Sequence, residues 1–157
     1  MGIARAFLPL LLLLGCTQEP PATRIDPHFG TTTYSSSTHL AGASIVSSHN
    51  VRAVMVERSK STTCSLLTYI TRNDLTYPKI ETVRAFGNTL PYARIDRHRA
   101  GPLRAEAGRI MMSCKEFARL ATVGIEFRMY GPRGVYSVSA PARLFSEALA
   151  QKAMPNG

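Results

Sequence analysis

The sequence predicts an α+β domain built from antiparallel β-hairpins or a meander, with two short helices in the C-terminal third. Two observations predict this class. Runs rich in β-branched residues, separated by turns that contain Gly or Pro, follow one another from about residue 44. Closer to the C-terminus, two segments instead carry apolar residues at helical spacing. Antiparallel strands with helices segregated from them are typical of α+β folds.

The strands expected before the first helix form five runs with turn residues between them. They lie at residues 51–57, 63–71, 80–86, 90–97 and 109–112. Gly87-Asn88 is a two-residue hairpin signal that joins the third run to the fourth. Gly101-Pro102 interrupts the chain before the fifth run, which is short and apolar.

A capping box marks the start of the first helix. The Ser113 hydroxyl can accept a hydrogen bond from the amide of Glu116, whose own side chain can reach back to the cap. Gly124 is placed to end this helix in a left-handed conformation. The face expected in the core carries Phe117, Leu120 and Ala121.

A last hairpin and a last helix complete the domain. Residues 125–130 alternate between apolar and polar side chains, and residues 135–139 return after a turn that contains Gly and Pro. Pro141 suits the first turn of a helix. The apolar stripe of that helix is Leu144, Phe145, Ala148 and Leu149.

The N-terminal segment has the pattern of an export signal. Residues 6–14 are nine apolar residues after Arg5. A helix that spans a bilayer needs about 20, so this run is too short to span and fits the apolar part of a signal peptide. The alternatives are an uncleaved N-terminal anchor and an ordinary signal cut elsewhere.

Leu13-Leu14-Gly15-Cys16 resembles the lipobox of a bacterial lipoprotein signal. The resemblance implies that the Cys16 thiol carries a diacylglycerol, that the chain is cut before Cys16 and that the new amine is acylated with a fatty acid such as palmitate. One acyl chain binds a membrane only reversibly, so three would anchor the protein firmly. Thr17, where an Asp would favour the inner membrane, implies the outer membrane with the domain facing the periplasm.

The resemblance divides the chain into three parts: residues 1–15 as the signal peptide, 16–43 as the lipidated cysteine with a flexible tether, and 44–157 as one periplasm-facing domain. Residues 17–43 are rich in Pro, Ser and Thr and poor in large apolar residues, a composition that buries little surface. As a coil, about 27 residues would span roughly 25–30 Å.

The C-terminal part also resembles small exported proteobacterial proteins of unknown function. The likeness covers about 40 residues, from the Ser113 capping box through residues 131–134 to the helix after Pro141. It implies no activity.

The chain is strongly basic. Lys and Arg number 19 against 10 acids, and 15 of the 19 are Arg. Loss of residues 1–15 would leave 18 basic residues and a net charge of +8. Such charge suits anionic lipid headgroups, lipopolysaccharide, a polyanionic wall polymer or an acidic protein. Nucleic acid is excluded as a partner because an exported chain rarely meets it.

The densest basic region lies between residues 84 and 109. It contains Arg84, Arg94, Arg97, Arg99, Arg104 and Arg109, with two acids. Strand alternation predicts that Arg97 and Arg99 share one face, and that Arg94 lies on the other with Asp96 and His98. We expect Arg94, Arg97, Arg99 and Arg104 to bind a protein partner or an anionic component of the envelope. The alternative is a solvated face that keeps the protein soluble.

Cys64 and Cys114 are the two cysteines that remain after Cys16. In an oxidising compartment, two cysteines predict a disulfide bond. The alternative is two separately buried thiols. Two cysteines cannot form a zinc site alone.

Catalytic and metal-binding patterns are weak. Asp96 beside His98 could orient an imidazole, but no matched nucleophile is visible and Gly-x-Ser-x-Gly is absent. His28, His39 and His49 are too widely spaced for a compact metal site. We therefore expect no catalytic residue, metal or cofactor.

Together these patterns predict a membrane-tethered lipoprotein whose domain binds or scaffolds without catalysis, for example as an accessory subunit of a cell-envelope assembly such as a secretion or conjugation apparatus. The alternative is an inhibitor or immunity-type protein that docks on an enzyme through the basic hairpin.

Overall fold

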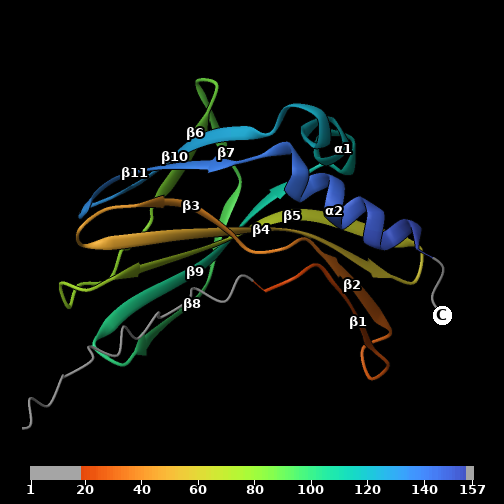
Figure 1. The fold of residues 1–157 in the computed structure, drawn as a ribbon, viewed down its shortest axis with the longest axis horizontal. Helices are drawn as coiled ribbons and strands as arrows, with labels where there is room; N and C mark the ends of the chain where they lie inside the picture. The colour runs from red at the N-terminus through yellow and green to blue at the C-terminus, as the bar shows by residue number, and fades with distance from the viewer. Residues whose placement is uncertain (1–18, 155–157) are drawn as a thin grey trace, which may run out of the picture.

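A computed structural model describes residues 19–154, except for the side chain of Ala100. Within this range the chain is mostly antiparallel β-structure, with two helices near the C-terminus (Figure 1). The strands are β1 (Ala22–Asp26), β2 (Thr31–Ser35), β3 (His39–Ala43), β4 (Ser47–Arg58), β5 (Ser61–Arg72), β6 (Thr82–Ala85), β7 (Asn88–Leu90), β8 (Tyr92–Ala100), β9 (Leu103–Met112), β10 (Ile125–Gly131) and β11 (Gly134–Ala140). The helices are α1 (Cys114–Val123) and α2 (Ala142–Ala153).

The larger sheet has seven strands in the order β1-β2-β4-β5-β9-β8, and β3 also pairs with β4. The long hairpin of β4 and β5 forms its centre, with paired residues from Ser47↔Arg72 to Arg58↔Ser61. Strand β2 pairs with the end of β4 near Arg58, and β3 pairs with the beginning of β4. The edge beyond β5 is the hairpin of β9 and β8.

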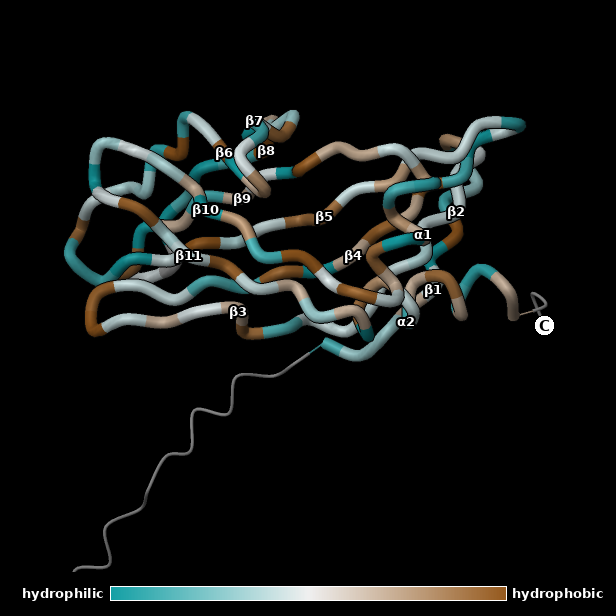
Figure 2. Tube along the Cα trace, turned by 90° about the horizontal axis from the view of Figure 1, so that it is seen from above, coloured by the Kyte–Doolittle hydropathy of each residue, from teal (hydrophilic) through white to brown (hydrophobic). Residues whose placement is uncertain are grey.

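The smaller sheet has four strands in the order β11-β10-β6-β7. It covers one part of the larger sheet, and the two helices cover another part on the same side (Figure 1). Viewed from above, hydrophobic stretches lie along β4 and β5 in the middle of the molecule (Figure 2). One core joins all the layers, because residues such as Leu66, Met129 and Phe145 belong to a single buried cluster.

Alternation decides which side of each strand enters this core. Along β10, Ile125, Phe127 and Met129 are buried while the residues between them are exposed. Along β5, Cys64, Leu66 and Ile70 are buried, as their common parity predicts. The rings of Phe117 and Phe145 meet edge to face at 5.1 Å between centroids, which fixes α1 against α2.

Several local predictions are confirmed. The Ser113 hydroxyl accepts a hydrogen bond from the Glu116 amide at the start of α1. Gly124 follows α1 with φ 68, a left-handed value that favours glycine. Glu116, however, pairs with Arg119 one turn further along instead of reaching back to the cap.

The predicted flexible tether over 16–43 is corrected for the described part of that segment. Residues 22–43 form β1, β2 and β3. The Thr-rich β2 lies against the edge of β4, which supplies backbone hydrogen-bond partners that composition alone does not reveal. Tyr34 is buried, and the fully buried Ser36 hydroxyl accepts a hydrogen bond from the amide of Ala53. This segment is part of the domain.

The predicted disulfide bond is present between Cys64 and Cys114. The two Cα atoms lie 5.2 Å apart and the sulfur atoms are bonded. The bond joins β5 to the first residue of α1, directly after β9.

Candidate functional site

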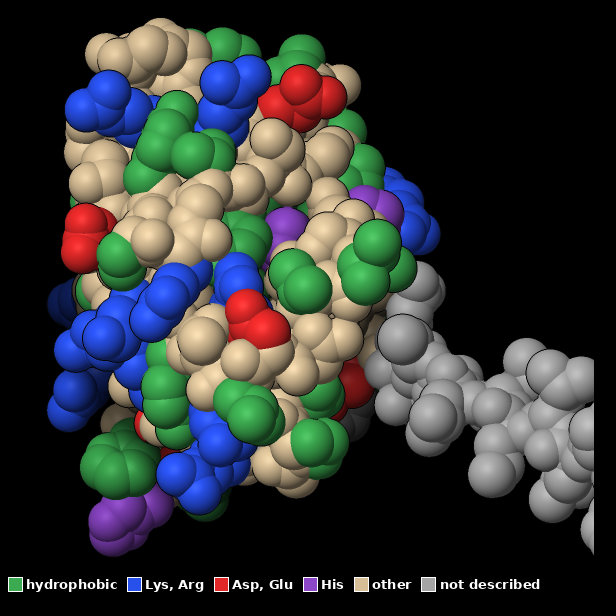
Figure 3. All heavy atoms as spheres, turned by 90° about the vertical axis from the view of Figure 1, so that its left-hand side faces the viewer, with side chains coloured by type: hydrophobic (Ala, Val, Ile, Leu, Met, Phe, Trp, Pro, Cys, Tyr) green, Lys and Arg blue, Asp and Glu red, His purple; other side chains and the backbone are tan. Residues whose placement is uncertain are grey.

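The hairpin of β8 and β9 carries a row of arginines across the edge of the larger sheet. Arg72 of β5 lies opposite Arg104 of β9, and Arg104 lies opposite Arg99 of β8. Like charges directly opposite each other on neighbouring strands repel, so an acidic side chain or a bound anion beside them would be stabilising. We call Arg94, Arg99 and Arg104 the basic surface. Figure 3 shows this end of the molecule, where Lys and Arg side chains outnumber Asp and Glu.

A β-bulge changes the predicted face of Arg94. The register shifts between Arg94 and Asp96, so Ile95 is an extra residue in β8. One extra residue inverts the alternation that follows it. Arg94 therefore lies on the face of Arg97 and Arg99, whereas Asp96 lies on the opposite face. The prediction that separated Arg94 from Arg97 and Arg99 was wrong for this reason.

Arg97 is not available to a partner in the way the sequence suggested. Its Nε donates to the carboxylate of Glu106 at 2.6 Å, and the Glu106 side chain is fully buried. The same carboxylate accepts hydrogen bonds from the Ile80 amide at 2.9 Å and the Tyr92 hydroxyl at 3.1 Å. Burial and the neighbouring Glu106 raise the pKa of Tyr92, so this phenol stays a donor. Arg97 thus neutralises a buried acid.

Gly108 makes room for this arrangement. A Cβ atom at Gly108 would collide with the ring of Tyr92. Because glycine has none, the Tyr92 ring can lie across β9 and reach Glu106.

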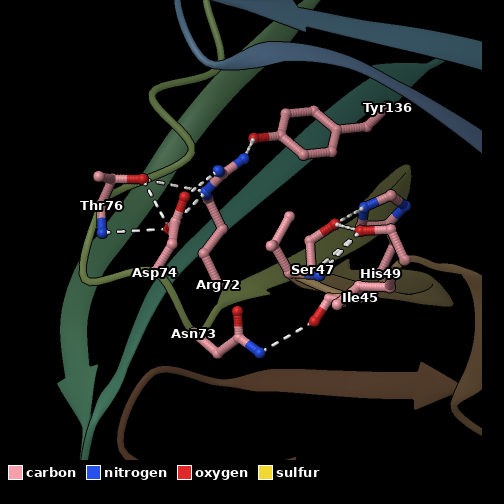
Figure 4. Close-up of polar contacts among 10 residues, drawn as sticks. Ile45, Ser47, His49, Arg72, Asn73, Asp74, Thr76 and Tyr136 are labelled. Carbon is pink, nitrogen blue, oxygen red and sulfur yellow. Dashed lines mark hydrogen bonds and ion pairs between the residues drawn. The ribbon is translucent and has the colours of Figure 1, made fainter.

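The loop after β5 contacts the arginine row at Arg72 and Arg104. Arg72 is buried and donates to both carboxylate oxygens of Asp74, while its Nη1 donates to the Tyr136 hydroxyl at 2.7 Å (Figure 4). The hydrogen bonds from Arg72, and then from Thr76, hold the pKa of Asp74 well below its ordinary value. Further along this loop, Tyr77 lies under the Arg104 guanidinium, 6.0 Å from centroid to Cζ.

His49 extends the same polar cluster between the sheets. Its ring meets Tyr136 edge to face at 5.0 Å, and its Nε2 lies 3.1 Å from the Ser47 hydroxyl (Figure 4). Burial lowers the pKa of His49, so the ring is neutral at neutral pH. The contacts of Arg72 and His49 with Tyr136 tie the loop after β5 and the beginning of β4 to β11 of the smaller sheet.

Positive charge remains after these pairs are counted. Arg72 is matched by Asp74 and Arg97 by Glu106. Within residues 19–154, Arg94, Arg99 and Arg104 form no ion pair, and Arg94 and Arg99 are exposed. The basic surface therefore has three uncompensated charges that an anionic group can approach.

The opposite face of the larger sheet holds the predicted Asp–His pair. Asp96 Oδ2 lies 2.9 Å from His98 Nδ1, and His98 Nε2 lies 2.9 Å from the Tyr69 hydroxyl. Burial, and then Asp96, raise the pKa of Tyr69. The raised pKa keeps the Tyr69 phenol protonated, so it can donate a hydrogen bond to His98.

An open groove of about 570 Å³ lies beside this chain. Its apolar lining includes Leu40, Leu67 and Ile95. Glu19, the first described residue, lies at its rim, where its carboxylate pairs with Arg52 and its carbonyl accepts from the amide of Thr38. The chain therefore enters the domain on this face.

The predicted lipid-attachment residue, Cys16, lies outside the described residues. Neither α1 nor α2 is long and apolar enough to cross a membrane. Over the same part of the chain, no three His, Cys, Asp or Glu side chains are grouped as metal ligands.

Comparison of the chain with protein-family models, with curated proteins and with solved structures finds no match. The functional argument therefore depends on the geometry of the molecule itself.

Proposed function

We propose that this protein is a bacterial lipoprotein whose domain binds or scaffolds without catalysis, as an accessory subunit of an envelope assembly at the outer membrane. Its partner is an acidic protein surface or an anionic envelope component. The observation that carries the proposal is the basic surface: Arg94, Arg99 and Arg104 share one face of a sheet edge without ion pairs among residues 19–154.

The neighbouring contacts support a binding role. Glu106 and Asp74 neutralise the two arginines that are partly or wholly buried, and they leave the exposed ones unmatched. A surface built only for solubility has no need for a fixed geometry, yet the Tyr77 ring lies under Arg104 and the β8 bulge sets the face of Arg94. Exposed charges of one sign also speed association with a partner of opposite charge.

Lipid attachment at Cys16 would place the domain close to the membrane. Glu19 lies three positions after Cys16, and an extended chain covers at most about 11 Å over three residue steps. The face that bears Glu19 would then lie near the bilayer, rather than 25–30 Å away on a long tether. This geometry suits a subunit that joins an assembly at the membrane surface.

The basic surface is tested by a triple variant, Arg94→Gln, Arg99→Gln and Arg104→Gln. A matched control, Arg24→Gln, Arg58→Gln and Arg133→Gln, removes the same charge from exposed positions elsewhere. Retention in the native complex and on anionic liposomes is measured at two salt concentrations. We expect the first variant alone to lose retention, and wild-type binding to weaken as salt rises. Equal retention of both variants would make the arginines a solubilising face.

Lipid attachment is tested separately with Cys16→Ser. Metabolic labelling with palmitate and membrane fractionation should show label on the wild type alone, and release or stalled processing of the variant. An unlabelled wild-type chain would contradict the anchor without affecting the test of the basic surface.

The alternative is an inhibitor or immunity-type protein that docks on one enzyme through the same hairpin. The β8 bulge favours this alternative, because the bulge brings Arg94 onto the same face as Arg99 and so gathers the cations on one face. Capture of a single enzyme at one-to-one stoichiometry would support this alternative, whereas co-purification of several subunits supports the assembly.

A further inference from the structure

The outer face of the smaller sheet carries a second group of cations, which is separate from the basic surface. Arg84 of β6 lies directly opposite Arg128 of β10. Hydroxyl residues extend this row on both sides, since Thr89 of β7 pairs with Arg84 and Ser137 of β11 pairs with Arg128. The register thus places two arginines next to each other on one face, between two hydroxyl residues.

The described chain gives these two arginines no direct ion-pair partner. Both are exposed, and neither forms an ion pair within residues 19–154. The Arg84 guanidinium lies over the ring of Tyr130, 5.9 Å from its centroid, which restricts its position. Like charges opposite each other cost stability, and a bound anion would remove that cost.

The turn beside this row is strained. Phe86 has φ 50 and Gly87 has φ 80, and together they connect β6 to β7. Glycine, Asn and Asp suit the first of these positions, whereas a bulky residue there is a conformational outlier. Phe86 is also 72% exposed, and its hairpin projects from the sheet in Figure 1. Strain of this kind is concentrated at functional sites.

The strained turn and the cations line the same hollow. A depression of about 680 Å³ is bordered by Arg84, Phe86, Arg128 and Ser137. Glu126 also lines it, two residues before Arg128 on the same face of β10 and opposite Ser139. The hollow therefore combines two cations, hydroxyl donors, an aromatic side chain at the rim and one acid.

We propose that this hollow binds a phosphate-bearing ligand. A phosphate monoester carries nearly two negative charges at neutral pH and has three acceptor oxygens, which match two guanidiniums flanked by hydroxyls. Phe86 packs against the organic part of the ligand. Glu126 faces the same hollow and opposes the anion, so it limits the affinity.

The site goes beyond the proposed function, because it lies on a different sheet from the basic surface. It is on the outer side of the smaller sheet, whereas Glu19 lies on the open face of the larger one. A protein anchored through Cys16 would turn this hollow away from its own bilayer. The binding itself does not depend on the anchor, so its test stands even if lipid attachment fails.

The experiment uses the full-length chain, purified in detergent, and titrates it with inorganic phosphate and with phenyl phosphate. Arginine Nε–H NMR signals report binding. The double variant Arg84→Gln/Arg128→Gln should bind both anions at least roughly tenfold more weakly, because charge-assisted hydrogen bonds are lost. The control Arg24→Gln/Arg58→Gln removes two charges from exposed strand positions and should bind like the wild type.

Two further variants make the test independent of folding defects. Glu126→Gln should bind phosphate more tightly, which a damaged fold would not do. Phe86→Asn should raise the melting temperature, because Asn tolerates a positive φ. The same variant should weaken the binding of phenyl phosphate more than the binding of inorganic phosphate. Vesicles with anionic phospholipid form the last arm, in which every chain also carries Cys16→Ser so that a lipid anchor cannot dominate vesicle binding. If Arg84→Gln/Arg128→Gln lowers vesicle binding, the phosphate that the hollow binds belongs to a lipid headgroup. Unchanged vesicle binding indicates that the ligand is a soluble phosphate ester.

No saturable shift with either anion, or equal weakening in the control, would overturn the proposal. So would a Glu126→Gln chain that binds phosphate no more tightly than the wild type.

Discussion

Glu106 shows how one residue determines the role of its neighbours. Its carboxylate is buried in the hairpin edge and accepts from an amide, a phenol and a guanidinium. Without it, the donors of Ile80 and Tyr92 would lose their acceptor, and Arg97 would lose its counter-charge. Arg97 thus has a structural role, although it lies among arginines whose pattern in the sequence predicts partner binding.

We predict that Glu106→Ala destabilises the domain by about 3 kcal/mol, because a buried ion pair is broken and buried donors are left unpaired. Urea unfolding followed by circular dichroism measures the change. Glu106→Gln keeps an acceptor for the amide and should cost less. If the alanine variant unfolds at the wild-type midpoint, this carboxylate does not stabilise the hairpin.

His49 is a second single residue with a large effect, because it makes the stability of the fold depend on pH. Burial lowers its pKa from the ordinary 6.5, so folding favours the neutral ring. Its contribution to stability is complete above about pH 6.5 and is lost as pH falls through the lowered pKa of the folded state. Burial and Arg143 lower the pKa of His39 as well, so His39 adds to the dependence of stability on pH.

We predict that the melting temperature falls between pH 7.5 and pH 5.5, a window above the titration of the carboxylates. His49→Phe, which keeps the ring contact with Tyr136, should reduce this fall. His39→Asn serves as the comparison and should reduce it less, because His39 is less buried. A His49→Phe protein with the full wild-type slope would show that His49 does not titrate in this way.

At the scale of elements, the disulfide bond ties the beginning of α1 to β5. Cys64 points into the core, and Cys114 is the first residue of the helix. The covalent link spans 50 positions in sequence. Helix α1 packs against β5 and α2, so the bond secures the layer formed by the two helices.

We predict that Cys64→Ser/Cys114→Ser lowers the free energy of unfolding by about 4 kcal/mol, since a loop of this size is no longer closed in the unfolded chain. Urea unfolding in a Cys16→Ser background, with and without reductant, measures it. Reductant should destabilise the parent protein to the level of the variant and leave the variant unchanged. A parent protein insensitive to complete reduction contradicts the prediction.

At the scale of the whole molecule, the groove, the hollow and the basic surface lie on different parts of the domain. The groove and Glu19 lie on the open face of the larger sheet, and the hollow beside Phe86 lies on the outer face of the smaller one. The basic surface occupies the edge of the larger sheet. Such an arrangement suits a subunit that contacts more than one neighbour.

We predict an orientation for the lipid-anchored protein on vesicles. A fluorophore at Leu40→Cys, in the groove, should be quenched by labelled headgroups more strongly than one at Phe86→Cys. The reason is the short reach of about 11 Å between Cys16 and Glu19. Equal quenching at both positions would mean that the domain tumbles freely about its anchor.

The local features of this fold were predictable because their causes lie within a few residues. The Ser113 cap and Gly124 follow from backbone geometry alone, whereas the hairpin predicted at Gly87-Asn88 turns one residue earlier, at Phe86-Gly87, and its return strand is the short β7 because β8 pairs with β9 in the larger sheet. The pairing of Cys64 with Cys114 followed from their number and the expected compartment. The density of arginine between residues 84 and 109 was likewise visible in the sequence.

Non-local pairing decided what the sequence did not reveal. The strands within 22–43 exist because β4 offers an edge, and composition carries no record of that edge. The bulge at Ile95 inverts a parity that simple alternation assigns to Arg94. The lone acid Glu106, set between two alanines, was a weak signal of a buried partner for Arg97.

By itself, then, the sequence determined the sign and abundance of the charge, the late helices, the disulfide pair and the expectation of export. The tertiary structure decided which arginines remain uncompensated and brought Arg84 opposite Arg128 from strands that lie more than 40 residues apart. The physical reason is that hydrogen-bonded strand pairing acts between distant segments, whereas composition and periodicity report only on a residue's own neighbourhood.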